Sequence, residues 1–318
     1  MSFNIKTVYM KARILYGAMF LTLYSLFFVA CQKDQSDDAD YTMETARHSD
    51  DQSRFSNEVD AAANDVNITV ESAAGFAGRT ENIQSFICDA TVAVDTMSNP
   101  RTITITYNGT NCLGNRIRTG VIIVSMAQGV RWKNAGAVIN VTYQNFKVTR
   151  LSDNKSITLN GTQSFTNVSG GLLINLPALN TITHTITSSN MSVTFDDNSQ
   201  HTWQVARQRV FTYNNGVVIT VTGMHSVNAI TGIAEWGTNR FGNAFTTSIA
   251  QPVVMRQDCS FRVGSGKVVH HTNLFNASVT FGLNANGNPT GCPGANPYYM
   301  KVEWTGPQGN TQSTLLPY

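Results

Sequence analysis

The sequence predicts an all-β protein, either a large antiparallel β-sandwich or a curved open sheet, with a short helix before it. Beyond residue 72, short runs rich in Thr, Val and Ile alternate apolar with polar residues, as in Thr102 to Tyr107 and Val138 to Tyr143. This period of two gives each strand one buried and one solvated face, which is typical of antiparallel sheets. No helical period of useful length occurs in the same part of the chain.

Asn and Gly residues separate these runs and mark the expected turns. The pairs and triplets are Asn108-Gly109, Asn160-Gly161, Gly170-Gly171, Asn214-Asn215-Gly216 and Asn286-Gly287. Such residues supply the positive φ angles that tight hairpin turns need. The spacing therefore indicates many short strands joined mainly by hairpins.

The N-terminus, residues 1–30, is predicted to be a lipoprotein signal peptide. A basic start is followed by the uncharged apolar run 14–30, and Cys31 comes directly after a small residue. This is the order of a secretory signal, and Phe28-Val29-Ala30-Cys31 resembles the lipobox of bacterial lipoproteins, which implies lipidation of Cys31. The apolar run is also about as long as the shortest membrane-spanning helix, so an uncleaved anchor is the alternative.

The expected location is the cell envelope, with the chain lipid-anchored at the outer membrane. The polar run after Cys31, from Lys33 to Asp38, is similar to the surface-export signal of Bacteroidota lipoproteins. Acyl chains contribute about 0.8 kcal/mol per buried CH₂, so several chains make attachment effectively permanent. The membrane is thus the first expected partner.

Charge is divided unevenly along the chain. Residues 32–65 hold ten acidic and three basic residues, a net charge of −7, whereas residues 66–318 hold sixteen basic and ten acidic, a net charge of +6. The basic residues are spread out rather than clustered, which argues against nucleic acid as a partner. The densest basic group is Arg116, Arg118, Arg131 and Lys133, for which we expect a solvated strand face.

The acidic part contains two predicted segments. Residues 31–50 lack any apolar pattern and are expected to be a flexible tether. Residues 51–66 carry Phe55, Val59, Ala62 and Val66 on one helical face. An isolated short helix is marginal in water, so this helix is expected to dock on the body. Residues 51–318 would then form a single domain.

Four cysteines remain once Cys31 is assigned to the lipid, and four allow three disulfide pairings. We favour Cys88–Cys112 and Cys259–Cys292, because each pair brackets a candidate hairpin whose antiparallel strands bring its two ends together. A metal site is the alternative, but no CxxC or HxxxH spacing supports it. We therefore expect no metal and no cofactor.

Two sets of residues are candidates for a binding site. The aromatic residues that could form a stacking platform, or fill the core instead, are Trp132, Trp203, Trp236, Trp304, Tyr298 and Tyr299. Glu235 and Glu303, each followed by a tryptophan, could serve as the carboxylate pair of a glycoside hydrolase. Neighbours on a strand face opposite sides, however, so a buried Trp beside an exposed Glu is the competing interpretation.

From Cys88 onward the chain resembles a family of Bacteroidota lipoproteins for which no activity is established. The likeness spans most of residues 50–318. Its pieces are Cys88 to Val92, Arg101 to Ile105, Asn111-Cys112, Arg116 to Ile122, Tyr143 to Phe146, Gly223, Pro252, Cys259 and Ser265-Gly266. The resemblance implies an envelope location and an all-β body, and it carries over no catalytic residue.

The expected function is that of a non-enzymatic envelope lipoprotein with a binding or structural role toward a glycan, a lipid or an envelope protein. One alternative is a lipid or lipoprotein carrier, in which an apolar concave sheet holds acyl chains and the docked helix acts as a lid. The other is a glycan-binding or glycoside-hydrolysing surface lipoprotein. No catalytic motif selects among these expectations.

Overall fold

The computed structural model describes residues 38–73, 76, 87–188, 191–292, 297–305 and 309–318. The chain divides into two compact units, Met1–Thr42 and Met43–Tyr318. Within the described residues the first unit contains only the start of a helix, and the second contains everything else. The predicted signal peptide, 1–30, and the lipidation site, Cys31, lie outside the described residues.

The predicted fold class is confirmed, because the described residues form sixteen strands of a single antiparallel sheet. The order along the sheet is β1-β2-β3-β4-β5-β6-β8-β11-β12-β13-β14-β15-β16, with the short β7, β9 and β10 paired beside this path. Most neighbours in the sheet are also neighbours in sequence. Local hairpins thus build most of the sheet, as the spacing of turns predicts.

The bounds of the elements are as follows. The helices are α2 (Asp38–Ser72), α4 (Leu176–Leu179) and the 3₁₀ turns η2 (Leu173–Asn175) and η3 (Gln257–Cys259). The strands are β1 (Ala90–Asp95), β2 (Arg101–Thr110), β3 (Arg116–Met126), β4 (Ala137–Arg150), β5 (Ser156–Asn167), β6 (Thr181–Ser188), β7 (Ser192–Thr194), β8 (Gln200–Tyr213), β9 (Val217–Gly223), β10 (His225–Val227), β11 (Ile230–Thr238), β12 (Ala244–Arg256), β13 (Val263–Thr272), β14 (Asn276–Leu283), β15 (Tyr299–Thr305) and β16 (Thr311–Pro317).

The helix α2 is much longer than predicted. It begins at Asp38 rather than Asp51 and continues to Ser72 rather than Val66, so the tether assigned to 31–50 was wrong for residues 38–50. No Gly or Pro interrupts this stretch. From Met43 to Arg54 it has almost no apolar residue, and that is why hydrophobic periodicity did not reveal it.

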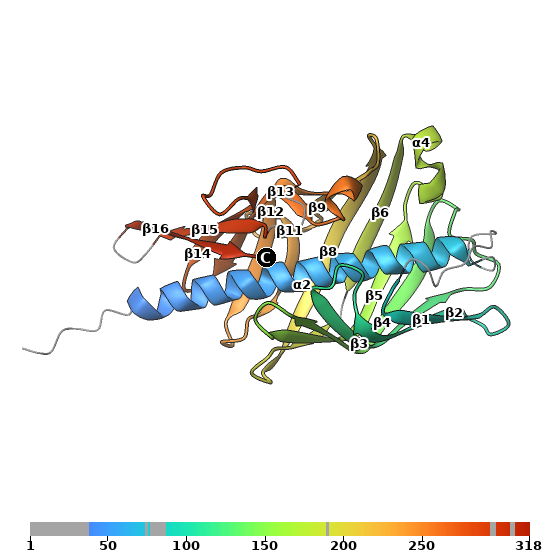
Figure 1. The fold of residues 1–318 in the computed structure, drawn as a ribbon, viewed down its shortest axis with the longest axis horizontal. Coiled ribbons are helices and arrows are strands. Elements are labelled where there is room, and N and C mark those ends of the chain that lie inside the picture. Colours follow the sequence, from blue (N-terminus) through green and yellow to red (C-terminus); the bar gives the residue numbers. More distant parts are fainter. Residues whose placement is uncertain (1–37, 74–75, 77–86, 189–190, 293–296, 306–308) are drawn as a thin grey trace, which may run out of the picture. The chain divides into compact units, whose positions relative to one another are not determined.

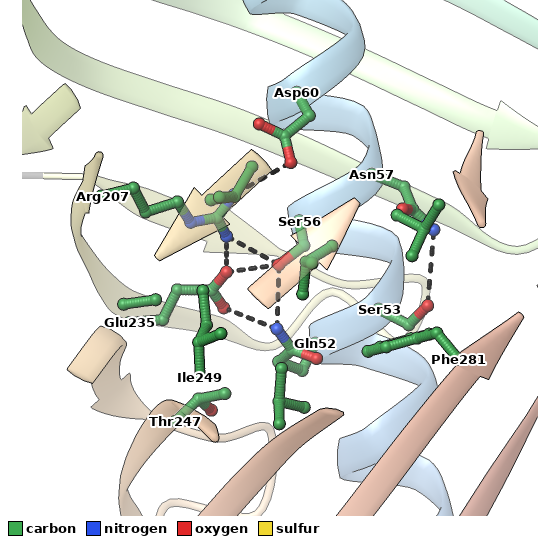
Figure 2. Close-up of a pocket in the computed structure, with 15 residues that line it drawn as sticks. Gln52, Ser53, Ser56, Asn57, Asp60, Arg207, Glu235, Thr247, Ile249 and Phe281 are labelled. Carbon is green, nitrogen blue, oxygen red and sulfur yellow. Dashed lines mark hydrogen bonds and ion pairs between the residues drawn. The ribbon is translucent and has the colours of Figure 1, made fainter. Parts of the chain in front are cut away.

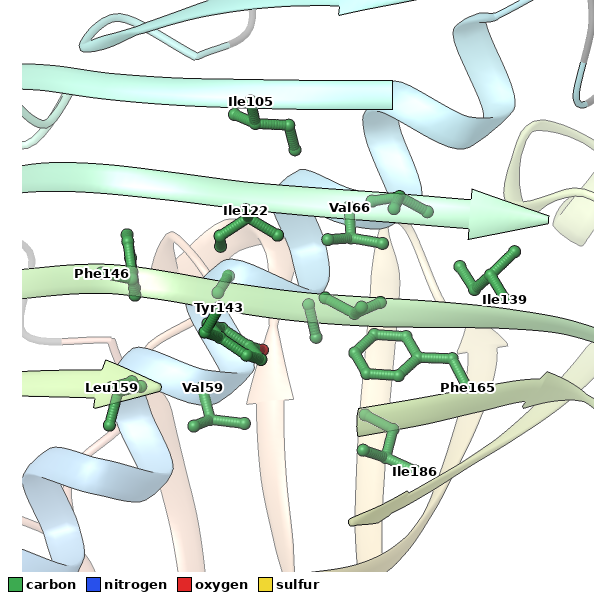
Figure 3. Packing of buried hydrophobic residues seen from close by; sticks show 14 of the residues in the cluster. Val59, Val66, Ile105, Ile122, Ile139, Tyr143, Phe146, Leu159, Phe165 and Ile186 are labelled. Carbon is green, nitrogen blue, oxygen red and sulfur yellow. The ribbon is translucent and has the colours of Figure 1, made fainter. Parts of the chain in front are cut away.

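From Phe55 onward, α2 packs its apolar stripe on the first part of the sheet. Val59 and Val66 are fully buried among inward side chains of β2 to β5, such as Ile122 and Phe165 (Figure 3). Phe55, also fully buried, stacks on Trp203 of β8. Figure 1 shows α2 crossing in front of β8, with β1–β5 around its C-terminal part. The predicted docking of the helix on the body is therefore found, with the expected residues at the contact.

A second hydrophobic cluster lies in the later strands and contains no residue of α2. It joins inward side chains of β9 and β12 to β15, for example Val221, Val253 and Phe281. The part of the helix that faces these strands is its polar side between Gln52 and Asp60. The two halves of the sheet thus meet two different surfaces of one helix.

Bulges interrupt the ladders where the sheet bends around the helix. In the β3–β4 ladder the register shifts between Thr119 and Val121. In the β4–β5 ladder it shifts between Tyr143 and Phe146. Gly120 has a φ of 100°, and a Cβ at this position would lie 2.2 Å from the carbonyl oxygen of Asn145. Only glycine fits there, and the bulge it permits increases the local twist of the sheet.

Both predicted disulfides are present. The Cα atoms are 5.3 Å apart in Cys88–Cys112 and 5.0 Å apart in Cys259–Cys292. The first closes the β1–β2 hairpin and the second brackets the β13–β14 hairpin. In the described part of the chain, no helix has both the length and the apolar composition needed to cross a bilayer.

Candidate functional site

Most of the predicted aromatic platform is core. Trp132, Trp203, Trp304 and Tyr298 are buried, so they present no surface on which a ligand could stack, and the prediction was wrong for these four residues. Trp203, for example, lies against Phe55 of α2 with a ring-centroid distance of 4.9 Å. Large aromatic residues on the inner side of a strand fill the space around the helix.

The remaining two aromatic candidates are half-buried and lie on strands far apart in the sheet. Trp236 of β11 stacks on His225 of β10, with ring centroids 4.2 Å apart. Tyr299 begins β15, which is separated from β11 by β12, β13 and β14. The two rings do not combine into one surface.

Glu235 is fully buried at the centre of a polar cluster between α2 and the sheet (Figure 2). Trp203 Nε1 donates to its Oε2 at 3.0 Å, and Gln52 Nε2 donates to the same oxygen at 3.3 Å. Its other oxygen accepts from Ser56 and forms an ion pair with Arg207. A carboxylate with this many donors is fixed in place.

The glycosidase pair is not assembled. Glu235 is on β11 and Glu303 on β15, four strand positions apart, which corresponds to about 19 Å at the spacing of neighbouring strands. Catalytic carboxylates of glycosidases lie within about 10 Å of each other. Glu303 is partly exposed and pairs with Lys301 at 2.7 Å, whereas Trp304 is buried as the competing interpretation expected.

The predicted solvated face at Arg116 and Arg118 is wrong, because both side chains turn toward α2. Arg118 donates to both carboxylate oxygens of Asp89, at 2.7 and 2.6 Å, and to Asp65 of α2 at 2.8 Å. Arg116 donates to Glu58 of α2 at 2.7 Å. Arg116 and Arg118 are thus partners of the acidic helix, whereas Arg131 and Lys133 of the same predicted group are exposed.

This pairing is repeated along α2, whose carboxylates meet basic residues of many strands and loops. The pairs are Asp50 with Arg150 and Lys155, Asp51 with Arg240, Glu58 with Arg116, Asp60 with Arg207, and Asp65 with Arg118. The helix therefore supplies the negative charge that the later part of the chain lacks. The uneven division of charge in the sequence is the signal of this contact.

One side of α2 is not covered by strands and forms the floor of an open groove of ≈ 280 Å³. The floor consists of Asn57, Glu58, Ala61, Asn64, Asp65 and Ile68. Asn57, Ala61, Asn64 and Ile68 recur at helical spacing and are only partly buried. They extend over about 16 Å of helix at 1.5 Å per residue.

The walls of the groove come from two loops, and a disulfide lies at each. One wall is the β2–β3 connection with the start of β3, including Cys112 and Arg116. The other follows Cys259 and includes Phe261, with Tyr318 beside it. Two crosslinked loops facing each other across a helix make a preformed concave site, as is usual for small-molecule binding.

The wall after Cys259 has an unusual backbone. Ser260 and Phe261 have φ angles of 54° and 55°, in the left-handed region that a bulky residue rarely adopts. The turn is held by hydrogen bonds from Ser260 N to Gln257 O at 3.0 Å and from Phe261 N to Arg256 O at 2.9 Å. This conformation directs the Phe261 side chain to the groove, and such strain is concentrated at binding sites.

A second, smaller cavity of ≈ 30 Å³ is also lined by Asn57 and lies between α2 and strands β9 and β11–β14 (Figure 2). Its size corresponds to about two water molecules. The helix lines it with Gln52, Ser53, Ser56, Asn57 and Asp60, while the sheet adds mainly apolar side chains such as Val221, Val268 and Phe281. Among the described residues, Gln52 Oε1 and Asp60 Oδ1 have no hydrogen-bond partner.

Asp258, Cys259 and Cys292 are close enough together to suggest a metal site, with ligand atoms within 4.8 Å of one another. Both cysteines are joined in the disulfide, however, and a disulfide sulfur is not the thiolate that binds metals. This group of residues therefore belongs to the disulfide next to the groove wall.

Comparison with known proteins gives no match: no protein-family profile, no curated protein and no solved structure is significantly similar to this chain. The site is consequently defined by its geometry alone. Of the groove residues, Asn111, Cys112, Arg116 and Arg118 were singled out from the sequence, whereas the half-buried stripe of α2 was not, although it follows a helical period.

Proposed function

We propose that the protein is a lipid-anchored, non-enzymatic protein of the cell envelope that binds a small ligand in the groove along α2. The groove carries this proposal, because a helix and two loops, each next to a disulfide, converge there on an open concave surface. Its polar and apolar residues alternate along the floor, which suits a small molecule of mixed character.

The carboxylates of the groove support a binding role rather than catalysis. Glu58 and Asp65 are each held by an arginine, at 2.7 and 2.8 Å, so neither is poised to transfer a proton. The pKa of Asp65 is raised because the side chain is buried, but its partner Arg118 opposes that shift. An acid–base pair directed at a substrate is absent from the described part of the groove.

The test of ligand binding is to fill the groove. Ala61→Trp places an indole on its floor, and we expect the small molecule that purifies with the mature protein from its native envelope to be lost. Ala178→Trp, on the exposed side of the short helix α4, is the matched control and should retain it. Native mass spectrometry measures the bound mass. Equal retention by both variants would refute the groove as the site.

The proposed anchor rests on the sequence around Cys31 and is supported by the two disulfides, which form in oxidising compartments outside the cytoplasm. We expect Cys31→Ala to abolish labelling with radioactive palmitate and to release the protein in soluble form. Undiminished labelling would show that the acylated residue lies elsewhere.

A further inference from the structure

The α4 loop, residues 168–180, is an apolar surface segment without a charged residue. Ile174 is 53% exposed, and Val168 and Leu179 are each 46% exposed. Figure 1 shows α4 projecting beyond the end of β6. Single exposed apolar residues are ordinary, but several on one projecting loop indicate an interaction surface.

A buried leucine fixes the position of this loop. Leu176 packs with Ile182 of β6 and Phe211 of β8 in the second hydrophobic cluster. Its neighbours in the turn, Ile174 and Leu179, belong to neither hydrophobic cluster. The loop therefore presents these two side chains to the outside from a base that is anchored in the core.

Two exposed cations lie beside the apolar loop. Gly171 N donates to Lys133 O at 2.8 Å, which joins the α4 loop to the turn that carries Arg131 and Lys133. A Cβ on Gly171 would lie 2.5 Å from Leu179 Cδ1, so Leu179 reaches the same junction. Both basic side chains are exposed. Positive charge and apolar side chains are thus adjacent at this junction.

Two further side chains border the loop. Tyr213 is half exposed and follows Thr212, whose strand partner Thr181 comes directly after the loop. Glu71 of α2 is only partly exposed, and its Oε1 accepts from Leu173 N at 2.8 Å. This carboxylate is therefore engaged with the backbone of the loop, and the exposed arginine and lysine supply the cationic part of the surface.

We propose that the α4 loop, together with Arg131, Lys133 and Tyr213, binds the surface of a lipid bilayer that contains anionic lipids. Ile174 and Leu179 insert among the acyl chains, and the two cations contact the phosphates of the headgroups. Tyr213 lies at the boundary, where a ring with a polar end is favoured. This mixture of aliphatic, aromatic and basic residues is typical of segments that bind at the membrane surface.

The bilayer is favoured over a protein partner by charge and polarity. Anionic headgroups lie above an apolar layer, and the patch likewise places Arg131 and Lys133 next to its aliphatic side chains. A symmetric contact between two copies of the chain would instead bring the cations of both patches together. The lipid surface is therefore the occupant that matches both parts of the patch.

The inference concerns a surface outside the groove and does not depend on the ligand of the groove. It adds a membrane contact to the proposed acyl anchor. Because Leu173 N donates to Glu71, the patch lies near the C-terminal end of α2, whereas Cys31 precedes the start of this helix. The protein would then be attached to the membrane at two points of the chain.

Vesicle flotation of the mature, full-length chain tests this inference. The chain carries Cys31→Ala, so that no acyl group contributes to binding. Vesicles of phosphatidylethanolamine and phosphatidylglycerol are compared with vesicles of phosphatidylcholine, which bear no net charge. We expect binding to the anionic vesicles and roughly twentyfold weaker binding to the neutral ones, because each cation near an anionic surface contributes about fivefold. Absence of binding to the anionic vesicles would overturn the proposal.

Paired substitutions in the loop locate the apolar contact. Ile174→Asn with Leu179→Asn should weaken binding to anionic vesicles by about tenfold or more, because the inserted aliphatic groups are lost. Val227→Asn with Leu274→Asn is the matched control, since both residues are 41% exposed outside the patch, and it should bind normally. Equal binding by the two paired variants would refute insertion of the loop.

A second pair of variants tests the charge. Arg131→Gln with Lys133→Gln should remove the preference for anionic vesicles. Lys147→Gln with Arg256→Gln is the control, because it removes the same net charge from exposed positions outside the patch. A preference that persists in the first pair, or is lost equally in both, would refute recognition of the headgroups by this patch.

A gain of binding keeps the inference testable if circular dichroism shows that the paired loop variant is unfolded. Ala178→Trp adds an indole to the exposed side of α4 and should strengthen binding to anionic vesicles severalfold. Unchanged binding of Ala178→Trp would mean that α4 does not meet the bilayer.

Sedimentation velocity covers the alternative occupant, a second copy of the chain. We expect the Cys31→Ala protein to be a monomer at the concentrations used for flotation. A dimer that Ile174→Asn with Leu179→Asn abolishes, in a protein that binds no vesicles, would assign the patch to self-association and overturn the bilayer.

Discussion

The two halves of α2 differ in apolar burial, although ion pairs run along both. From Met43 to Arg54 the helix is polar yet largely buried, and its carboxylates Asp50 and Asp51 are gripped by arginines of the sheet and its loops. From Phe55 to Ser72 it adds an apolar stripe buried against the sheet to the ion pairs of Glu58, Asp60 and Asp65. Hydrophobic periodicity reveals a helix only where its partner surface is apolar, and an ion-paired helix has to be found through its charge.

The difference also concerns energetics. Apolar burial stabilises a fold roughly in proportion to the area removed from water. Buried ion pairs contribute little net stability, because desolvation opposes the attraction, but removing one partner costs several kcal/mol. We therefore expect the first half of α2 to define where the helix lies on the sheet. The second half is expected to contribute most of the free energy of unfolding that the helix supplies.

The largest expected effect is the loss of a buried ion pair in the first half. Arg240 donates to both oxygens of Asp51, at 2.6 and 2.7 Å, and both side chains are buried. Arg240→Ala leaves Asp51 without its cation, and we expect the free energy of unfolding to fall by about 3 to 5 kcal/mol. Urea denaturation measures this change.

The control for this variant is an exposed ion pair. Arg256 and Asp258 are each about half exposed, so Arg256→Ala should change the unfolding free energy by less than about 1 kcal/mol. A similar loss in Arg240→Ala and Arg256→Ala would contradict the view that the first half of α2 is held by buried charges.

A smaller effect is expected from pH, also in the first half. His48 is fully buried among Trp203, Phe245 and His270, and neither ring nitrogen has a hydrogen-bond partner in the described residues. Burial lowers the pKa of His48 from 6.5 to about 3. Below pH 6.5 the unfolded chain takes up a proton that the folded chain excludes, so stability falls as pH decreases.

The size of this effect follows from the shift. At pH 5 the contribution of His48 amounts to about 2 kcal/mol of lost stability relative to pH 7. His48→Phe keeps the aromatic packing and removes the titratable imidazole. The free energy of unfolding should therefore fall less between pH 7 and pH 5 than it does for the unmodified protein. An unchanged slope would mean that His48 is protonated in the folded state.

Much of the architecture was predictable from residues close together in sequence. Alternation located the strands, and the bracketing of hairpins gave Cys88–Cys112 and Cys259–Cys292. Asn160-Gly161, predicted as a turn, instead lies inside β5, where Gly161 pairs with Tyr143 next to a register shift. Glycine occurs in bulges as well as in turns, and a single sequence does not show which of the two a given Asn-Gly pair forms.

The site was far less predictable, because its parts are distant in sequence. The groove brings together α2, the β2–β3 connection, the segment after Cys259 and Tyr318. Nothing in a single strand shows which of its faces meets the helix, so Trp132 and Trp203 were taken as candidates for a surface although they are core. Likewise Glu235 appeared free until Arg207 and Ser56 were seen beside it.

The smallest expected effect lies in the apolar stripe of the second half of α2. Val59 is fully buried in the cluster formed with β2–β5, and Val59→Ala removes two methyl groups from it. We expect a loss of about 1.5 kcal/mol, from lost burial and a small residual cavity, that does not vary between pH 7 and pH 5. Unfolding at both pH values measures it.

Because His48 lies on the other half of the helix, the effects of Val59→Ala and His48→Phe should add. A strong interaction between them would show that the two halves leave the sheet as one unit before the rest of the protein unfolds.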